Sequence, residues 1–295
     1  MHDELADRFE AHRADLRAVA HRMLGSAAEA EDAVQETWLR LCRVDADGVD
    51  NLAGWLRTVL SRVCLDALRR RRTRREDVVD HVPDAPTADD DPETEALLAD
   101  SVGRALLVVL DTLTPAERVA FVLHDTFAVP FDRIAPILGR SSATTKKLAS
   151  RARHKVRGTT ALPRLELARQ RHVVDAFLAA ARAGDFDALL AVLDPDVVRR
   201  ADPAALPPGA AVEVRGAHAV AAETVLLTAN ARHAAPALVD GRVGIVVAPG
   251  GRLRFALAVT VRDDRIAAYE VIAEPARLRR LTLSVDFYRD LNQVR

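Results

Sequence analysis

The sequence predicts a multidomain protein in which two all-α modules precede an α+β domain. Three observations indicate this fold class. Apolar residues recur every three to four positions through most of residues 5–158, which is the period of a helix. From residue 238 to 273 the period falls to two, as it does in strands. Between the two helical modules, residues 81–96 are acidic and rich in proline, which is typical of a flexible linker.

The composition favours a protein that uses neither a metal nor a membrane. The 295 residues suffice for two or three domains with apolar cores. Cys42 and Cys64 have no second Cys or His at ligand spacing, so we expect reduced thiols, with no zinc site, disulfide or cofactor. The chain starts without a signal-peptide pattern, and no stretch reaches the apolar length of a membrane span. We therefore expect a cytoplasmic protein.

The first predicted module, residues 1–80, begins with two helices. One covers residues 3–24 and ends at Gly25. Ser26 and Glu29 have the spacing of a capping box, which begins the next helix. The polar face of that helix carries Asp32, Gln35 and Glu36. Acidic residues near a helix N-terminus also complement the helix dipole, so the residues alone leave two explanations for this surface.

A third helix is expected after Asn51, whose side chain can cap it. Outside its apolar stripe the helix carries Arg57, Ser61, Arg62, Asp66 and Arg69. It continues into residues 69–75, six of which are arginine. Such a run repels itself unless a polyanion neutralises it, and arginine suits phosphate oxygens and base stacking. The alternative is a solvated basic tail.

The second module, residues 97–160, is predicted to contain four helices. The first covers residues 97–111, and the second begins at a capping box formed by Thr114 and Glu117, with proline at the first helical position. The last two helices cover residues 131–158 and follow the helix-turn-helix plan, in which the second helix enters the major groove of DNA.

Several residues support that plan. Gly139 supplies the turn, and Ser141 or Ser142 can cap the last helix. The expected buried stripe of this helix is Leu148, Ala152 and Val156, and Thr145 can donate its hydroxyl to the Ser141 carbonyl. Its remaining surface is basic, because no carboxylate occurs between Arg140 and Arg164. A solvated helix on an ordinary bundle is the alternative, although solvated helices usually mix both signs of charge.

Residues 166–275 are predicted to form the α+β domain. Helices ending at Gly184 and near residue 193 precede a proline-rich loop and a third helix around 217–229. An antiparallel meander follows, with a hairpin turn at Asp240-Gly241. A curved sheet over helices can leave a ligand pocket. Residues 276–295 are predicted to form an amphipathic tail helix.

Three segments, in this order, resemble extracytoplasmic-function sigma factors of the sigma-70 family. They are GSAAEAEDAVQETWLRL, NLAGWLRTVLSRVCLDALRRRR and LTPAERVAFVLHDTFAVPFDRIAPILGRSSATTKKLASRAR. The C-terminal region resembles the SnoaL or NTF2-like cone fold, which a subgroup of these factors carries as a fused regulatory extension. The glycine-rich motif of that subgroup corresponds here to Ala248-Pro249-Gly250-Gly251-Arg252.

The resemblance implies three sets of binding residues and no catalytic residues. Core RNA polymerase would contact Asp32, Gln35 and Glu36. The melted -10 strand of promoter DNA would contact Arg62, Asp66, Arg69, Arg70, Arg71 and Arg72. Duplex -35 DNA would contact Ser141, Ser142, Ala143, Lys146, Lys147, Ser150 and Arg151. A small ligand in the C-terminal domain and a separate anti-sigma factor remain open.

Two alternatives belong to other classes of protein. The C-terminal domain could be a small-molecule enzyme, for which Asp202, His218 and His233 are candidate acids or bases, although they share no characteristic spacing. The chain could also be a ligand-sensing DNA-binding regulator that works without polymerase. Such a regulator would have no use for the acidic surface of Asp32, Gln35 and Glu36.

Overall fold

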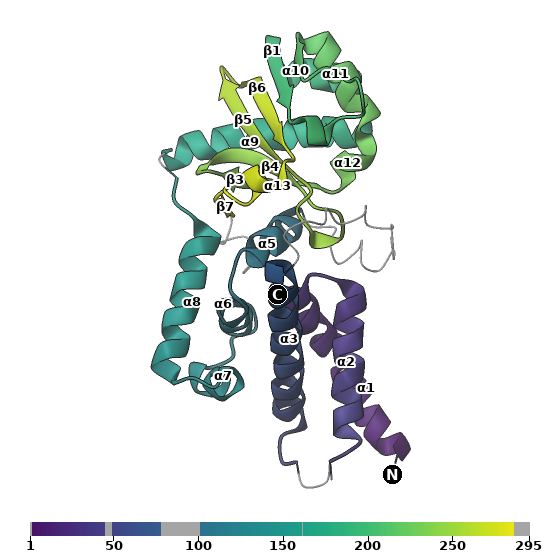
Figure 1. Ribbon diagram of the computed structural model, residues 1–295, viewed down its shortest axis with the longest axis vertical. Helices are drawn as coiled ribbons and strands as arrows, with labels where there is room; N and C mark the ends of the chain where they lie inside the picture. Colours follow the sequence, from purple (N-terminus) through teal and green to yellow (C-terminus); the bar gives the residue numbers. More distant parts are fainter. Residues whose placement is uncertain (1, 45–48, 78–100, 161, 286–295) are drawn as a thin grey trace. The chain divides into compact units, whose positions relative to one another are not determined.

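The computed structural model describes residues 2–44, 49–77, 101–160 and 162–285. They divide into two compact units, residues 1–89 with 113–154 and residues 90–112 with 155–295. The first unit is helical, and the second contains a mixed sheet covered by helices (Figure 1). The predicted order of all-α modules followed by an α+β domain is confirmed. The predicted acidic linker lies outside the described residues.

Three helices form the first module: α1 (His2–Leu24), α2 (Ala27–Leu41) and α3 (Leu52–Asp77). They lie side by side (Figure 1), and their shared core includes fully buried Met23, Leu41 and Leu60. Asn51 caps α3 as predicted, because its side chain accepts a hydrogen bond from the Gly54 amide at 2.8 Å. These caps and stripes are local features, which explains why they could be read from the sequence.

Three details of this module differ from the sequence analysis. Ser26 caps α2, but the Glu29 side chain does not close the capping box and instead pairs with Arg71. Ser61, expected outside the stripe, is buried and donates to the Arg57 carbonyl at 2.7 Å. Both cysteines are free thiols; Cys42 is exposed, and burial raises the pKa of the Cys64 thiol to about 12. Cys64 is therefore a core residue.

The first unit also contains α6 (Pro115–Phe121), the π-helical turn η2 (Val122–Thr126), α7 (Phe131–Leu138) and most of α8 (Ser142–Arg157). The predicted capping box is complete: Thr114 and Glu117 each accept the backbone amide hydrogen of the other. The buried stripe of α8 differs from the expected one. It consists of Thr145, Ala149, Ala152 and Val156, whereas Leu148 is only half-buried.

Thr145 explains that difference in register. Its side chain is fully buried, and its hydroxyl donates to the Ser141 carbonyl at 3.0 Å, as predicted. The hydroxyl is thus satisfied within the helix, so a threonine can occupy the core position that its polarity would otherwise make costly.

The second unit is built on a sheet whose described strands number seven, in the order β2-β1-β6-β5-β4-β3-β7. The strands are β1 (Leu193–Ala201), β2 (Glu213–Arg215), β3 (Ala234–Val239), β4 (Arg242–Val247), β5 (Phe255–Arg262), β6 (Arg265–Ile272) and β7 (Leu283–Ser284). Every neighbouring pair is antiparallel except β1 and β6. The Asp240-Gly241 hairpin joins β3 and β4 as predicted, with positive φ at both residues.

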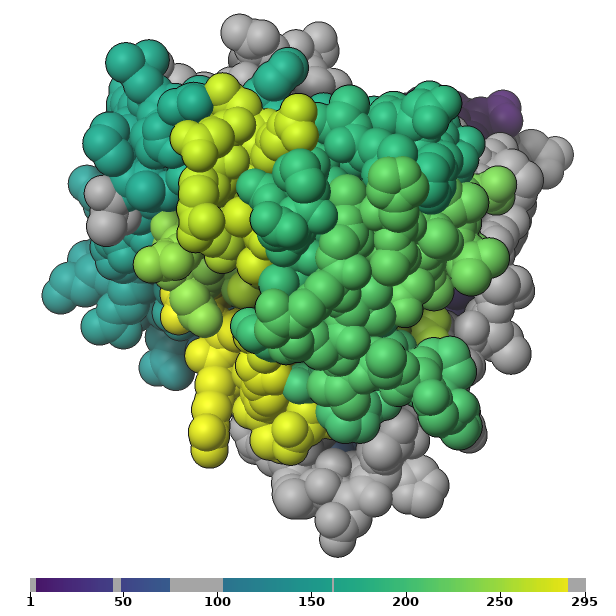
Figure 2. All heavy atoms as spheres, turned by 90° about the horizontal axis from the view of Figure 1, so that it is seen from above, coloured from purple at the N-terminus to yellow at the C-terminus, as the bar shows by residue number. Residues whose placement is uncertain are grey.

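Helices cover this sheet and supply the other half of its apolar core. They are α9 (Arg164–Ala183), α10 (Phe186–Val192), α11 (Ala217–Leu226) and α12 (Thr228–Arg232); 3-10 turns η3 (Pro203–Ala205) and η4 (Pro249–Gly251) lie in the loops. Val174, Leu189 and Ile266 are fully buried members of that core. In the space-filling view the green segment containing α10 and α11 adjoins the yellow strand β6 (Figure 2).

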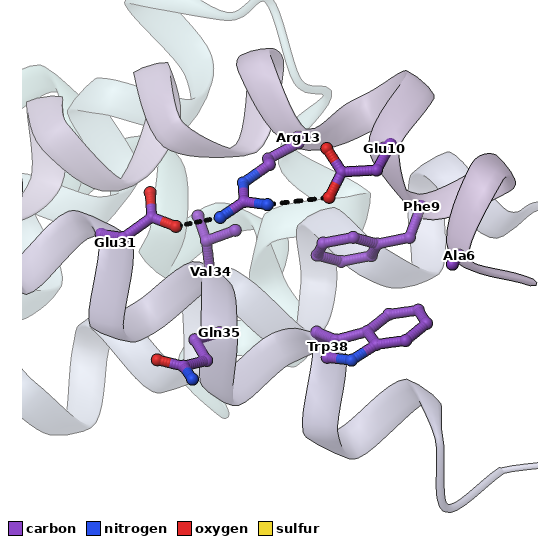
Figure 3. A pocket seen from close by; sticks show the side chains of 8 residues that line it. All are labelled: Ala6, Phe9, Glu10, Arg13, Glu31, Val34, Gln35 and Trp38. Carbon is purple, nitrogen blue, oxygen red and sulfur yellow. Dashed lines mark hydrogen bonds and ion pairs between the residues drawn. The ribbon is translucent and has the colours of Figure 1, made fainter. Parts of the chain in front are cut away.

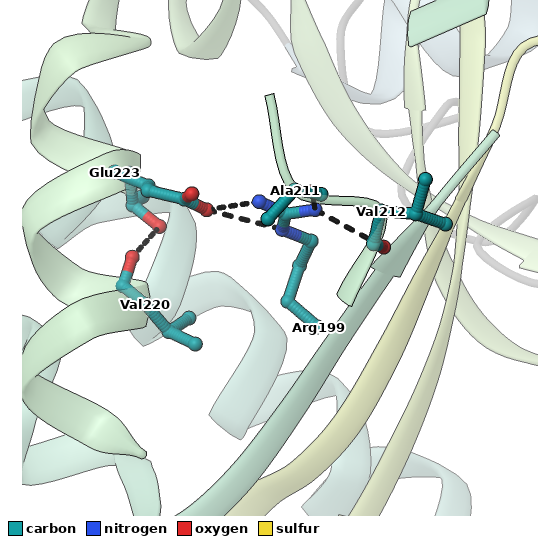
Figure 4. A network of polar contacts seen from close by, with 6 residues as sticks. Arg199, Ala211, Val212, Val220 and Glu223 are labelled. Atoms are coloured by element: carbon teal, nitrogen blue, oxygen red, sulfur yellow. Dashed lines mark hydrogen bonds and ion pairs between the residues drawn. The ribbon is translucent and has the colours of Figure 1, made fainter. Parts of the chain in front are cut away.

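Strand β1 was not predicted, because a buried arginine interrupts its apolar alternation. Val197, Arg199 and Ala201 all point inward, and Arg199 is only 5% exposed. Its guanidinium donates to Glu223 of α11 and to the carbonyl oxygens of Ala211 and Val212, at 2.8 and 3.3 Å for the two carbonyls (Figure 4). The charge is therefore compensated where it is buried.

The predicted tail helix over residues 276–295 is wrong for the part that the structure describes. A short helix, α13, ends at Leu278, and Leu283–Ser284 form β7, which pairs with β3. Asp240 fixes this return, because its amide donates to the Thr282 carbonyl at 2.9 Å and its carboxylate accepts from the Thr282 amide at 2.8 Å. Residues 286–295 lie outside the described residues.

The second unit also contains α5 (Ser101–Asp111), the first helix of the module predicted over residues 97–160. All residues from 105 to 110 are buried, so the helix has no solvent face there. It packs against β3, β7 and η4, and Arg104 donates to the Arg232 carbonyl at 2.7 Å. The C-terminal sheet thus supplies part of the surroundings of α5.

The end of α8 lies in the same unit. The Val285 amide donates to the Val156 carbonyl at 2.8 Å. At Gly158 the backbone turns with a φ of +60°, and Ser284 occupies the space into which a side chain at 158 would project. We call residues 282–285 the strap, because they connect the β3–β4 hairpin, the edge of the sheet and the end of α8.

Asp202 is expected to stabilise the C-terminal unit. Its burial opposes ionisation, but the amides of Glu274 and Ala273 and the Arg277 guanidinium outweigh that effect and hold the pKa of Asp202 below its usual value. A lowered pKa means that the stabilisation is present above the ordinary Asp pKa of about 3.9 and is lost as pH falls through the folded-state pKa.

We therefore predict that Asp202→Asn lowers the unfolding temperature by about 2–4 °C at pH 7. The difference from the parent should shrink in progressively more acidic buffer, where the native carboxylate is protonated as well. Calorimetry at a series of pH values measures this difference. Asp187→Asn, at an exposed carboxylate of α10, is the matched control and should leave the unfolding temperature unchanged. A gap that is independent of pH would contradict the assignment.

Candidate polymerase and nucleic-acid interfaces

Helices α7 and α8 have the geometry of a helix-turn-helix. Gly139 ends α7 in the left-handed conformation, with φ 63° and ψ 40°, and the Arg140 amide donates to the Ala135 carbonyl at 3.0 Å. Ser141 caps α8, since its hydroxyl accepts from the Thr144 amide at 3.2 Å. The first turn of α8 is therefore held rigidly and leaves its amides and side chains available to a ligand.

The predicted -35 residues form one exposed surface on α8. Those exposed are Ser141, Ser142, Ala143, Lys146, Lys147, Ser150 and Arg151. In the part of the chain that the structure describes, Lys146 and Lys147 make no ion pair with a carboxylate. The basic surface is thus not consumed by contacts inside the protein, as it would be in an ordinary bundle with mixed charges. Hydroxyl, methyl and ammonium groups can contact both phosphates and base edges.

The turn before α7 positions α8, a feature that the sequence analysis missed. Asp125 of η2 accepts from Arg153 of α8 at 2.7 Å, and its side chain is only 8% exposed. His124 stacks on Phe131 with ring centroids 3.8 Å apart. π-helical turns are rare and frequently occur at functional sites. The Asp-Arg spacing of 28 residues has no helical periodicity, so no local pattern could have indicated the pair.

A second basic surface lies on α3. Arg62, Asp66, Arg69, Arg70 and Arg72 are all exposed. The first four lie at i, i+4, i+7 and i+8, which places them on one side of the helix. Arg69 lies 3.5 Å from the Asp66 carboxylate, so the pair is weak and solvent-exposed. The remaining surface can accept an extended polyanionic strand.

Arg71 is the exception among the predicted -10 residues. Its side chain is 18% exposed, donates to the Leu24 carbonyl at 3.0 Å and pairs with Glu29. These contacts tie α3 to the start of α2. The structure therefore uses Arg71 to hold the module together, and we assign it to the fold and not to the DNA-facing surface.

The predicted polymerase-binding residues lie on the outer face of α2. Asp32 and Gln35 are exposed, and Glu36 is half-buried and accepts from Arg40 at 2.8 Å, one helical turn later. Leu39, on the same side as Gln35, is 45% exposed, which is unusual for a large apolar side chain on a helix that already has a buried face. The face thus combines carboxylate, amide and apolar groups.

A cavity of about 310 Å³ opens between α1 and α2, next to that face. Its apolar wall consists of Ala6, Phe9, Val34 and Trp38, and its polar rim of Glu10, Arg13, Glu31 and Gln35. The rings of Phe9 and Trp38 tilt against each other with centroids 5.0 Å apart. Figure 3 shows Arg13 at the other end, between Glu10, which it contacts at 2.8 Å, and Glu31. Hydrogen bonds to Glu31 and Glu10 raise the pKa of Arg13.

The candidate acids and bases of the C-terminal domain do not form a site together. Asp202 holds the chain near Arg277, His218 is exposed and meets only the edge of Phe186, and His233 is half-buried. Among the described residues, no group of three or more His, Cys, Asp or Glu side chains could hold a metal ion. None of the helices described is both long and apolar enough to cross a membrane.

Comparisons with known proteins agree with these surfaces. The families described as Sigma-70 region 2 and Sigma-70, region 4 match residues 8–74 and 103–156. The probable ECF RNA polymerase sigma factor SigI of Mycobacterium tuberculosis is 37% identical over 287 residues, covering 94% of this chain and 96% of the relative. The ECF RNA polymerase sigma factor SigJ of the same species is 40% identical over 291 residues, covering 90% of this chain and 91% of the relative.

The crystal structure of the SigJ factor covers 93% of this chain and 98% of its own, with 35% identity and a TM-score of 0.47. The two sequence relatives match through both helical modules and the C-terminal domain, at identities above 30%. The chain therefore belongs to the extracytoplasmic-function sigma factors of the sigma-70 family, which direct RNA polymerase to initiate transcription.

Proposed function

We propose that this chain recognises promoters by dividing the work between its two helical modules once it is bound to core RNA polymerase. The single observation that supports this most is the exposed basic surface of α8, mounted on a rigid turn and without ion pairs at Lys146 and Lys147 in the described chain. Through that surface, α8 enters the major groove of the -35 element. Its phosphate contacts position the helix, and its few base contacts select the sequence.

The exposed arginines of α3 act on the -10 element. Arg62, Arg69 and Arg70 line one side of the helix, and they hold the non-template strand after its bases unstack. Favourable binding to the single strand offsets part of the free energy needed to open the duplex. Catalysis of RNA synthesis belongs to the polymerase, so no catalytic residue is required in this chain.

The experiment is transcription by core polymerase with and without this chain, on fragmented genomic DNA, with the transcript 5′ ends mapped. Start sites that depend on the chain should share one element near -10 and another near -35. Failure of the chain to bind core polymerase, together with binding to DNA alone, would instead favour the ligand-sensing regulator.

The C-terminal domain is proposed to regulate the factor by supporting the -35 module at both of its ends. The sheet and η4, the turn containing the glycine-rich motif, contact α5, and the strap binds the end of α8 at Val156. A change in the sheet can therefore alter the helices that carry DNA recognition. A small ligand or a catalytic role there is less well supported, because Asp202 and Arg199 already serve the fold.

We predict that Val285→Pro in the full chain lowers run-off transcription by about fivefold, because proline cannot donate to the Val156 carbonyl and one backbone hydrogen bond is lost. Val285→Ala keeps the amide hydrogen and separates the effect of trimming the buried side chain. A chain of residues 1–165 tests removal of the whole domain. Equal promoter dependence and yield for all these proteins would contradict a regulatory role.

A further inference from the structure

We propose that the cavity between α1 and α2 receives one large apolar side chain from the same polymerase helices that contact the acidic face of α2. This inference rests on the proposed function, since it extends the polymerase contact from one helix of the module to two. It assigns binding roles to Ala6, Phe9 and Trp38, none of which belongs to the predicted set of Asp32, Gln35 and Glu36.

The walls of the cavity favour an apolar occupant. Phe9 is 4% exposed and Val34 1%, so both are held firmly by the core beneath, while Trp38 is half-buried and flanks the opening. The aromatic pair therefore presents a rigid surface that water covers in the free protein. Filling it releases that water, and interface hot spots are commonly anchors of this kind, inserted into a preformed pocket.

The position of the cavity favours the polymerase as its partner. Gln35 both lines the cavity and belongs to the face predicted to bind polymerase. Trp38 follows Gln35 by three residues and Leu39 follows it by four, so all three lie on adjacent positions of α2. A partner helix laid along α2 would meet the carboxylates near its start and the cavity beside its middle (Figure 3).

The charges around the opening define what flanks the apolar anchor. Arg13 is held by Glu10 and Glu31, and Glu36 is held by Arg40, which leaves Asp32 and the excess of carboxylates facing outward. The matching surface is therefore a helix on which an apolar side chain lies between lysines or arginines. An acidic helix would meet like charges at this face.

The decisive substitution is Ala6→Leu, which fills the cavity from a half-buried position without removing any core side chain. Ala11→Leu adds the same group to an exposed position of the same helix that does not line the cavity, and it is the matched control. We expect Ala6→Leu to weaken the affinity of the full chain for core polymerase by about 10- to 30-fold, and Ala11→Leu by less than about twofold.

The salt dependence of the loss identifies its origin. Because the anchor is apolar, the loss for Ala6→Leu should be the same in low and high salt, whereas a loss caused by disturbed charges should shrink as salt rises. Thermal unfolding of both variants should match the parent. If Ala6→Leu does not fold, Ala6→Glu and Ala11→Glu form a second pair, in which the carboxylate at position 6 blocks the apolar opening.

The outcomes separate the cavity from the proposed function. If Ala6→Leu binds polymerase like Ala11→Leu, while charge reversal at Asp32 and Glu36 abolishes binding, the cavity is not an anchor site and the proposed function stands. If charge reversal also leaves binding intact, the acidic face itself has been assigned to the wrong partner.

Discussion

Reversing the charge of the acidic face, with Asp32→Lys and Glu36→Lys together, should weaken binding to core polymerase by about 100-fold or more. Each substitution removes a carboxylate from an exposed position of α2 and places an ammonium where a basic helix is expected. Opposed like charges at an interface cost several kcal/mol, and about 2.7 kcal/mol corresponds to 100-fold in affinity. Promoter-directed transcription should fall in parallel, because the factor works only when bound.

Competition against the parent chain for a limited amount of core polymerase measures this loss. The matched control is Asp15→Lys with Asp50→Lys, which changes the net charge equally at two exposed positions of the same module. The control should retain the parent affinity within about threefold at physiological salt, where surface charges beyond about 8 Å are screened. Equal losses for both double variants would mean that overall charge, and not this face, governs assembly.

Replacing both exposed lysines of the recognition helix, with Lys146→Ala and Lys147→Ala, should weaken promoter binding by the complete polymerase assembly by about tenfold at moderate salt. Each lysine that contacts a phosphate releases counterions, so the plot of log affinity against log salt should become less steep by about 0.9 per contact, or about 1.8 for the pair. A loss at base contacts would instead change which sequences are preferred.

Titrating promoter fragments at several salt concentrations gives both the affinity and the slope. Arg262→Ala with Arg265→Ala removes two exposed charges from a hairpin of the C-terminal domain and serves as the control. The control should keep the parent slope. An unchanged slope for the lysine variant, with unchanged promoter-directed transcription, would remove α8 from the DNA interface.

Much of the helical architecture could be predicted because its signals are local. The Thr114 cap, the left-handed turn at Gly139 and the Asp240-Gly241 hairpin each depend on a few neighbouring residues, and each occurs where expected. The exposed faces of α2, α3 and α8 follow from helical periodicity in the same way, apart from Arg71.

The features that could not be predicted depend on partners distant in sequence. Strand β1 is hidden by Arg199, whose burial is acceptable only because Glu223 lies opposite on α11. The strap alternates apolar and polar residues too briefly to distinguish a strand from a helix, and its pairing with β3 decides the matter. The cavity exists because α1 and α2 diverge around Phe9 and Trp38, both of which simply appear as core residues in the sequence.

The close approach of Ser284 to Gly158 has a consequence for evolution and for engineering. Position 158 tolerates neither another backbone conformation nor a β-carbon, so even alanine there must dislodge the edge of the sheet. A random mutational screen for promoter activity should therefore return glycine alone at this site, far from any nucleotide. Compensating changes should arise at Ser284, with glycine as the simplest solution.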